Sequence, residues 1–114
     1  MHGHPTPLVL VVCGDAERVY RLRAELRRCG FLPAFARSTA MASALFAQIR
    51  IEAVVLCPGD SLGQLDPLQE TVRDMAGMPR FILADATPLP GWTACSEEQL
   101  IGQLRAIFAE QPDP

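Results

Sequence analysis

The sequence contains no lysine. All ten basic residues are arginine, and the 114-residue chain carries a formal net charge of −3. Any mechanism that requires a lysine side chain is therefore excluded. The acidic balance also argues against a general nucleic-acid binder, so we expect no nucleic-acid partner.

Long apolar runs and targeting signals are missing as well. No apolar stretch approaches the roughly 18 residues of a membrane-spanning helix, so we expect no membrane partner. The first seven residues lack the basic region and the long apolar core of a secretory signal. We therefore expect a cytoplasmic protein whose four cysteines are free thiols. No Cys-x-x-Cys spacing is present for zinc binding or redox pairing.

The composition nevertheless predicts a folded domain. Hydrophobic residues make up 49% of the chain, which is typical of a globular rather than a disordered sequence. The length suits one domain with a modest core. We assign this domain to residues 8–108, with flexible tails at residues 1–7 and 109–114.

The run Glu52–Gly59 is central to the predicted fold. Its apolar part consists of Ala53–Leu56 and Cys57, and it lies between a charged residue and a Pro-Gly break. This pattern is typical of a strand that is buried on both faces, as in a parallel sheet covered by helices. In such sheets, ligands bind at the carboxyl ends of the strands. Cys57 occupies that end, and its role is the main functional question.

The other apolar patterns alternate between strand and helix. Further strands are predicted at Leu8–Val12, Leu32–Ala36 and Phe81–Ala84. Helices are predicted from Asp15 to about Cys29, from Ser38 or Thr39 to about Ile49, from Asp66 to Gly77, and from Ser96 to Phe108. Pro33 confines the second strand to a sheet edge, because proline cannot donate to a central ladder. The order predicts an α/β fold with parallel strands.

The chain resembles the receiver domain of bacterial response regulators over roughly Leu8 to Phe108. The resemblance rests on five segments: Leu10-Val11-Val12, Arg28-Cys29-Gly30-Phe31, Ala53-Val54-Val55-Leu56, Met78-Pro79, and Ser96-Glu97-Glu98-Gln99-Leu100. It implies a flavodoxin-like, doubly wound parallel sheet in three α/β/α layers. The implied strand order is 2-1-3-4, with a short or absent fifth strand.

The residues that carry the family's chemistry are replaced in this chain. Receivers take a phosphoryl group on an aspartate after the third strand and bind magnesium through an acidic pair after the first. A Thr or Ser ends their fourth strand, and a lysine ends the fifth. In this chain the phosphoacceptor position is Cys57, and the acidic pair falls on Cys13 and Gly14, with Asp15 one place late. The hydroxyl position is Ala84, and the lysine position lies near Thr93. Thiols are poor magnesium ligands, because hard cations select oxygen. The resemblance therefore implies a pseudo-receiver: non-enzymatic, without cofactor or metal, and acting on a signalling protein partner independently of phosphorylation.

Receivers also carry a helix between the fourth and fifth strands. Here Asp85–Trp92 provides only eight residues, three of them Pro88, Pro90 and Gly91, whereas a helical crossover takes a dozen or more. We expect that helix to be missing, and the bared surface to form an association face, most simply a homodimer through the last helix. The alternative is that Trp92 folds back over the sheet. The residues expected at the interface are Leu89, Trp92, Leu100, Ile101, Leu104 and Phe108.

The cysteines suggest an alternative function. Cys13, Cys57 and Cys95 fall at the ends of the first, third and fifth strands, so all three could converge on one crevice. Three thiolates can hold zinc or copper(I), which favours a redox or soft-metal sensor. The competing interpretation is simple packing, since cysteine is a small hydrophobe that is often buried.

Charged residues suggest two weaker sites. Arginines crowd the first helix and could bind phosphate, as in a cyclic dinucleotide; a solvated helix face with acidic neighbours is the competing interpretation. These are Arg18, Arg21, Arg23, Arg27 and Arg28. Asp15, Asp60 and Asp85 lie on loops at the same edge of the sheet, where a residual divalent-cation site competes with ordinary helix capping.

Overall fold

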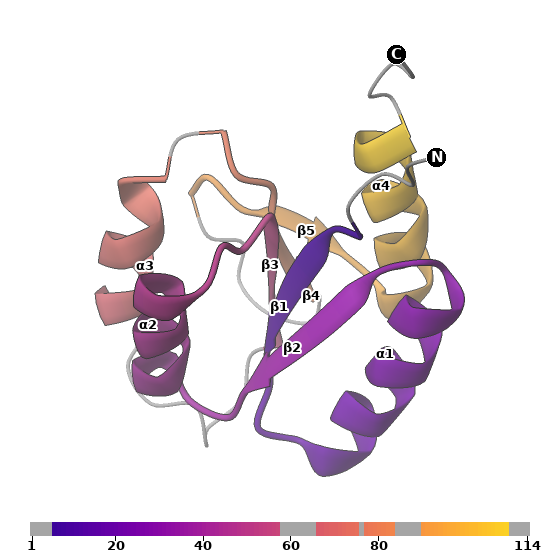
Figure 1. The fold of residues 1–114 in the computed structure, drawn as a ribbon, viewed down its shortest axis with the longest axis horizontal. Helices are drawn as coiled ribbons and strands as arrows, with labels where there is room; N and C mark the ends of the chain where they lie inside the picture. Colours follow the sequence, from indigo (N-terminus) through magenta and orange to yellow (C-terminus); the bar gives the residue numbers. More distant parts are fainter. Residues whose placement is uncertain (1–5, 58–65, 76, 84–89, 110–114) are drawn as a thin grey trace.

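The computed structural model describes residues 6–57, 66–75, 77–83 and 90–109 as a sheet between two layers of helices (Figure 1). The strands are Leu8–Val12 (β1), Leu32–Ala36 (β2), Ala53–Leu56 (β3), Arg80–Leu83 (β4) and Thr93–Cys95 (β5). The helices are Ala16–Arg28 (α1), Thr39–Gln48 (α2), Asp66–Arg73 (α3) and Glu97–Ala109 (α4). All strand pairs are parallel, in the order β2-β1-β3-β4-β5. The predicted doubly wound sheet is confirmed, and Pro33 lies in an edge strand.

The fifth strand forms, and it is short. β5 pairs with β4 so that Phe81 lies opposite Thr93, and Leu83 opposite Cys95. Of the two expectations for the fifth strand, short or absent, the short strand is observed, and it covers the edge of β4. The sequence predicts that no helix lies between β4 and β5. Most of that segment, residues 84–89, lies outside the described residues.

The helices begin where their capping residues predict. The Asp15 carboxylate accepts hydrogen bonds from backbone N–H groups in the first turn of α1, and the Ser38 hydroxyl accepts one at the start of α2. At α4, the backbone N–H of Ser96 donates to the Gln99 side chain, and that of Gln99 donates to the Ser96 hydroxyl, both at 3.1 Å. This reciprocal capping box satisfies two N–H groups that the helix itself cannot pair.

The third helix ends earlier than predicted, at Arg73 rather than near Gly77. The Arg80 side chain of β4 explains part of this end, because its Nη2 donates to the carbonyl oxygens of Val72 at 2.6 Å and Met75 at 3.3 Å. The same two carbonyl oxygens also accept the backbone N–H groups of Met75 and Met78, so hydrogen-bonded turns follow the helix. Gly77 follows with a φ of +86°, a conformation that residues with a side chain rarely adopt.

The core is divided between the two faces of the sheet. Successive strand residues point to opposite faces, so Val55 packs toward α1 and α4, whereas Val54 packs toward α2 and α3. Figure 1 shows these two helix pairs on opposite sides of the sheet. The cluster beneath α1 and α4 consists of Val9, Val11, Cys13, Leu22, Leu26, Phe31, Ala53, Val55, Cys57, Phe81, Leu83, Cys95, Leu100 and Leu104.

Trp92 belongs to the core on the other face. Its side chain is 7% exposed and joins the cluster that includes Leu68, Val72 and Ile82. Of the two sequence-based interpretations, folding back over the sheet is therefore the one observed. Trp92 is not a surface anchor, because its ring covers β4 beside α3.

We expect Trp92→Ala to lower the free energy of unfolding by about 3–5 kcal/mol, because a large buried ring is replaced by a cavity. Urea denaturation followed by circular dichroism measures the change. Met41→Ala is the matched control: Met41 is 46% exposed, and its loss should change stability by no more than about 0.5 kcal/mol. A Trp92→Ala variant as stable as the Met41→Ala variant would contradict the burial of Trp92.

Candidate functional site at the carboxyl edge of the sheet

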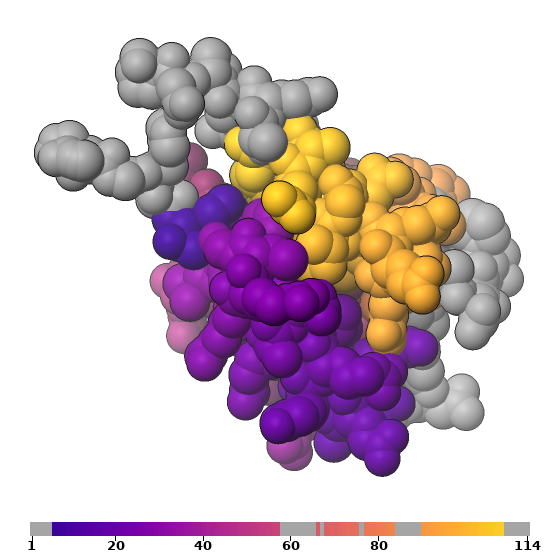
Figure 2. Space-filling model, turned by 90° about the vertical axis from the view of Figure 1, so that its right-hand side faces the viewer, coloured from indigo at the N-terminus to yellow at the C-terminus, as the bar shows by residue number. Residues whose placement is uncertain are grey.

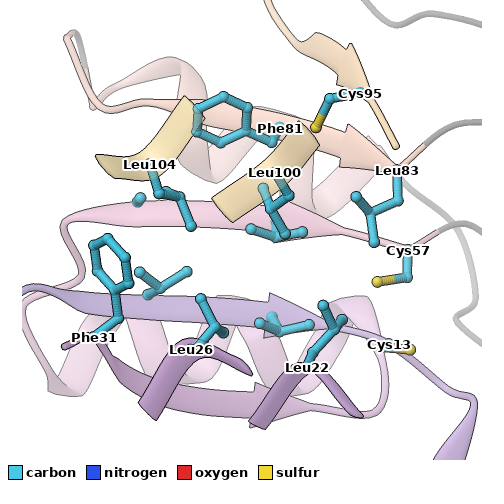
Figure 3. Close-up of a cluster of buried hydrophobic side chains, with 14 residues drawn as sticks. Cys13, Leu22, Leu26, Phe31, Cys57, Phe81, Leu83, Cys95, Leu100 and Leu104 are labelled. Atoms are coloured by element: carbon cyan, nitrogen blue, oxygen red, sulfur yellow. The ribbon is translucent and has the colours of Figure 1, made fainter. Parts of the chain in front are cut away.

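The strand register places four side chains in one row at the carboxyl edge. Cys13 and Cys57 directly follow the last paired residues of β1 and β3. Leu83 ends β4 and comes next in the row, and it pairs with Cys95, which ends β5. All four belong to the cluster beneath α1 and α4. Figure 3 shows Leu83 between Cys57 and Cys95.

The three thiols therefore separate into a pair and a single residue. Cys13 and Cys57 lie side by side after neighbouring strands, and the Cys13 thiol donates to the Asp15 carbonyl oxygen at 3.6 Å. Neighbouring strands lie about 4.8 Å apart, so Cys95, two strands away, is about 10 Å from Cys57. The expected convergence of all three cysteines was wrong, because Leu83 separates Cys95 from the other two. We call Cys13 and Cys57 the thiol pair.

The thiol pair is closed to solvent. Cys13 is 1% and Cys57 2% exposed. Burial raises the pKa of the Cys57 thiol far above its usual range, and the adjacent Cys13 sulfur adds to the rise, whereas Arg18 opposes it. Burial also raises the pKa of Cys95. At neutral pH Cys57 and Cys95 are therefore thiols, not reactive thiolates.

An ion-pair cluster borders the thiol pair on the α1 and α4 side. Arg18 Nε lies 2.7 Å from Glu97 Oε1, and Arg21 Nη2 donates to the same oxygen at 3.2 Å. Arg18 is close enough to act electrostatically on Cys57 and Cys13. The cluster joins the first turns of two helices that follow β1 and β5, and thus bridges the carboxyl edge of the sheet.

This ion-pair cluster was not predicted from the sequence. Arg18 was grouped with the other arginines of the first helix, and Glu97 was treated as part of a capping pattern. A signal was present, because both residues lie in the first turn of a helix that directly follows a strand. Helices in that position begin at the same edge of a parallel sheet, which brings their first turns together.

The other positions expected to be degenerate lie in ordinary structural roles. Gly14 is exposed between β1 and α1, and the Asp15 carboxylate is used in capping α1. Thr93 is the first residue of the three-residue strand β5, and Cys95 is the last, so the position assigned near Thr93 lies within this short strand. Ala84 lies outside the described residues, as do Asp60 and Asp85.

Four of the five arginines of α1 have partners within the chain. In addition to the cluster with Glu97, Arg28 pairs with Glu25, and the Arg23 guanidinium lies 5.2 Å from the centre of the Phe35 ring. These contacts direct the side chains to different neighbours along the helix. They do not gather into one phosphate site, so the cyclic-dinucleotide alternative gains no support. Among the described residues, no group of three or more His, Cys, Asp or Glu side chains is placed to hold a metal ion.

The expected interface is only partly available on the surface. The α4 residues Leu100 and Leu104 are fully buried against the sheet. Trp92 is buried on the other face of the sheet. Ile101 and Phe108 are half-buried, and the Phe108 ring packs edge-on against Phe31, with ring centres 5.8 Å apart. Leu89 lies outside the described residues.

A groove runs between α1 and α4 instead. It has a volume of about 590 Å³, with Leu22, Ala24 and Ile101 among its apolar lining. Tyr20 also lines it and is the most exposed large hydrophobic side chain among the described residues, at 74%. Figure 2 views the molecule from this side, with α1 in purple alongside α4 in yellow. The charged lining consists of Arg21, Glu25, Glu97 and Glu98.

The fold is similar to solved receiver structures at low sequence identity. The receiver domain of Francisella response regulator 1452 aligns with a TM-score of 0.73 and 16% identity, covering 94% of this chain and 100% of that chain. Chemotaxis response regulator CheY4 of Vibrio cholerae gives 0.69 and 15%, covering 90% and 99%. The N-terminal domain of a response regulator receiver protein from Methanoculleus marisnigri JR1 gives 0.60 and 17%, covering 91% and 98%.

No protein-family model matches the chain, and no curated protein matches its sequence. The chain therefore has the receiver fold, which confirms the fold implied by the sequence resemblance. At these identities the likeness establishes the fold alone, and activity has to be argued from the site. Among the described residues, no helix is long and apolar enough to cross a membrane.

We expect Cys57 to be alkylated by iodoacetamide at least about tenfold more slowly in the folded protein than in urea at about pH 8, because each unit of raised pKa removes tenfold of the thiolate. Peptide mass spectrometry at timed intervals gives the rate for each cysteine, and the urea-unfolded protein is the control. Equal rates in the folded and unfolded states would reveal an open, reactive thiolate and would favour a redox sensor.

Proposed function

We propose that the chain is a receiver-fold signalling module that does not accept a phosphoryl group and acts by binding another protein. The observation that carries this proposal is Cys57, a buried thiol at the carboxyl end of β3. The receiver family, which this chain resembles, carries its phosphoacceptor aspartate at that position. A protonated thiol inside a hydrophobic cluster can neither bind magnesium nor attack a phosphoryl donor efficiently.

The surroundings of Cys57 support the same proposal. Cys13 takes one position of the family's acidic pair, and Asp15 turns its carboxylate to the N-terminus of α1. No lysine is present to neutralise a transferred phosphoryl group. Arg18 is the nearby cation, and it is paired with Glu97. The thiols in place of an acceptor carboxylate after β3 and of an acid directly after β1 together favour a function that depends on contact rather than on phosphoryl transfer, in the cytoplasm with other signalling proteins.

The groove between α1 and α4 is the surface we propose for that contact. It combines an exposed Tyr20 with apolar walls from Leu22 and Ile101, and aromatic residues are enriched among the residues that dominate binding energy. Ile101 belongs to the association face that the sequence predicted, so the last helix remains part of the proposed face. Side chains of α1 take the place of the predicted interface residues that are buried. A two-fold homodimer is the simplest arrangement, because one self-complementary patch closes the assembly.

We expect no phosphorylation when the reduced protein is incubated with acetyl phosphate and Mg²⁺. Intact-mass spectrometry should show an unchanged mass, because the position after β3 is a buried thiol rather than a carboxylate. A phosphorylatable receiver domain treated in parallel serves as the positive control. A hydroxylamine-sensitive phosphoryl adduct, or a magnesium-dependent beryllofluoride complex, would contradict the proposal.

Sedimentation velocity at micromolar concentrations tests the association face. We expect the wild type to self-associate and Tyr20→Ala to weaken the dimer by about 2 kcal/mol or more, as the loss of a central aromatic contact does. Met41→Ala is the matched control, because Met41 is 46% exposed on α2, over the opposite face of the sheet. A wild-type protein that remains a clean monomer would rule out the homodimer and leave a different protein as the partner.

A further inference from the structure

The thiol pair has a chemistry that the proposed function does not use. Cys13 and Cys57 directly follow the last paired residues of two neighbouring parallel strands, and both side chains belong to the cluster beneath α1 and α4. Thiolates are the side chains that select soft metal ions. We propose that the thiol pair is a binding site for a monovalent soft cation, copper(I), held by the two sulfur atoms in two-coordinate geometry.

The number of available ligands decides the choice of metal. Structural zinc sites take four ligands, and calcium and magnesium take oxygen ligands. The third cysteine at this edge, Cys95, is separated from the thiol pair by Leu83. No group of three or more suitable side chains is assembled within the described residues. Copper(I) is a soft ion that two thiolates satisfy without a third protein ligand.

The charges around the thiol pair balance such a complex. Two thiolates and one copper(I) ion carry a net charge of −1. The adjacent cluster contains two guanidinium groups, from Arg18 and Arg21, and one carboxylate, from Glu97, and so carries a net charge of +1. This positive cluster acts on both sulfur positions through Arg18, from a site where the Arg18 side chain is 31% exposed and the two sulfurs are buried.

The binding step is an exchange of protons for a metal ion. The two S–H bonds break, the protons pass to solvent, and two Cu–S bonds form while the copper stays in its +1 state, so no oxidant or reductant is needed. The surrounding cluster contributes Leu22, Leu83 and Leu100. An apolar shell of this kind limits solvent access and so keeps water from adding as a further ligand.

Anaerobic competition with the copper(I) chelator bathocuproine disulfonate tests the proposal on the whole reduced chain. We expect the wild type to retain a single copper(I) ion per chain, and Cys13→Ser and Cys57→Ser each to lose it to the chelator. Cys95→Ser is the matched control, since Cys95 is also buried, at 3% exposure, in the same cluster; it should bind copper like the wild type. Circular dichroism establishes that each variant is folded.

Three results would overturn the proposal: a wild type that takes no copper, a Cys13→Ser variant that keeps it, or equal loss in Cys95→Ser. X-ray absorption spectroscopy on the copper-loaded wild type is independent of variant folding. It should show two sulfur ligands, and three or more would also overturn the proposal.

Arg18→Gln should weaken copper binding by about 10-fold, as the loss of a supporting charge near a metal does, whereas Arg28→Gln should have no effect. Equal affinities of these two variants would refute the role of Arg18.

Discussion

Burial of β3 on both faces is the constraint on which the rest of the structure depends. All four residues of Ala53–Leu56 are completely buried, so each face of the strand requires its own layer of helices. That requirement favours a parallel sheet, because crossover connections place helices over both faces. A parallel sheet in turn brings the carboxyl ends of the strands to one edge. The position of Cys57 beside Cys13 follows from this arrangement.

The chemistry of that edge is set by a few residues that the fold itself does not need. Closely spaced carboxylates repel one another unless a metal or a proton intervenes. Buried thiols instead add to the hydrophobic cluster and carry no charge. The receiver fold is thus kept with thiols rather than carboxylates directly after β1 and β3. The strands are held by apolar side chains that lie beneath the edge, so the fold does not depend on which residues occupy these two positions.

The parts of the structure that were predictable are those encoded locally. The bounds of β1 and β2, the edge position of Pro33 and the capping box at Ser96 follow from short patterns whose physical basis lies within a few residues. The burial of Trp92 could not be predicted from the local sequence, because it depends on α3 and β4, which lie elsewhere in the chain. The same holds for Arg18 and Glu97, which meet only when the sheet aligns the starts of α1 and α4. For the thiols, the sequence indicated the right edge, but the order of strands across the sheet decided that Leu83 separates Cys95 from Cys57.

The ion pair between Arg18 and Glu97 links the two features for which functions are proposed. Each of these side chains is 31% exposed, so the pair contributes about 0–1 kcal/mol to stability, too little to explain why the fold holds. Its effect is electrostatic and positional: it puts a guanidinium beside the thiol pair, and Glu97 also lines the groove between α1 and α4. A new negative charge on the thiols would compete with Glu97 for Arg18. Because α1 and α4 are joined through this carboxylate, such competition acts directly on the walls of the groove. If both proposals hold, occupation of the thiol pair and binding in the groove are thermodynamically coupled, and each must alter the affinity of the other by the same factor.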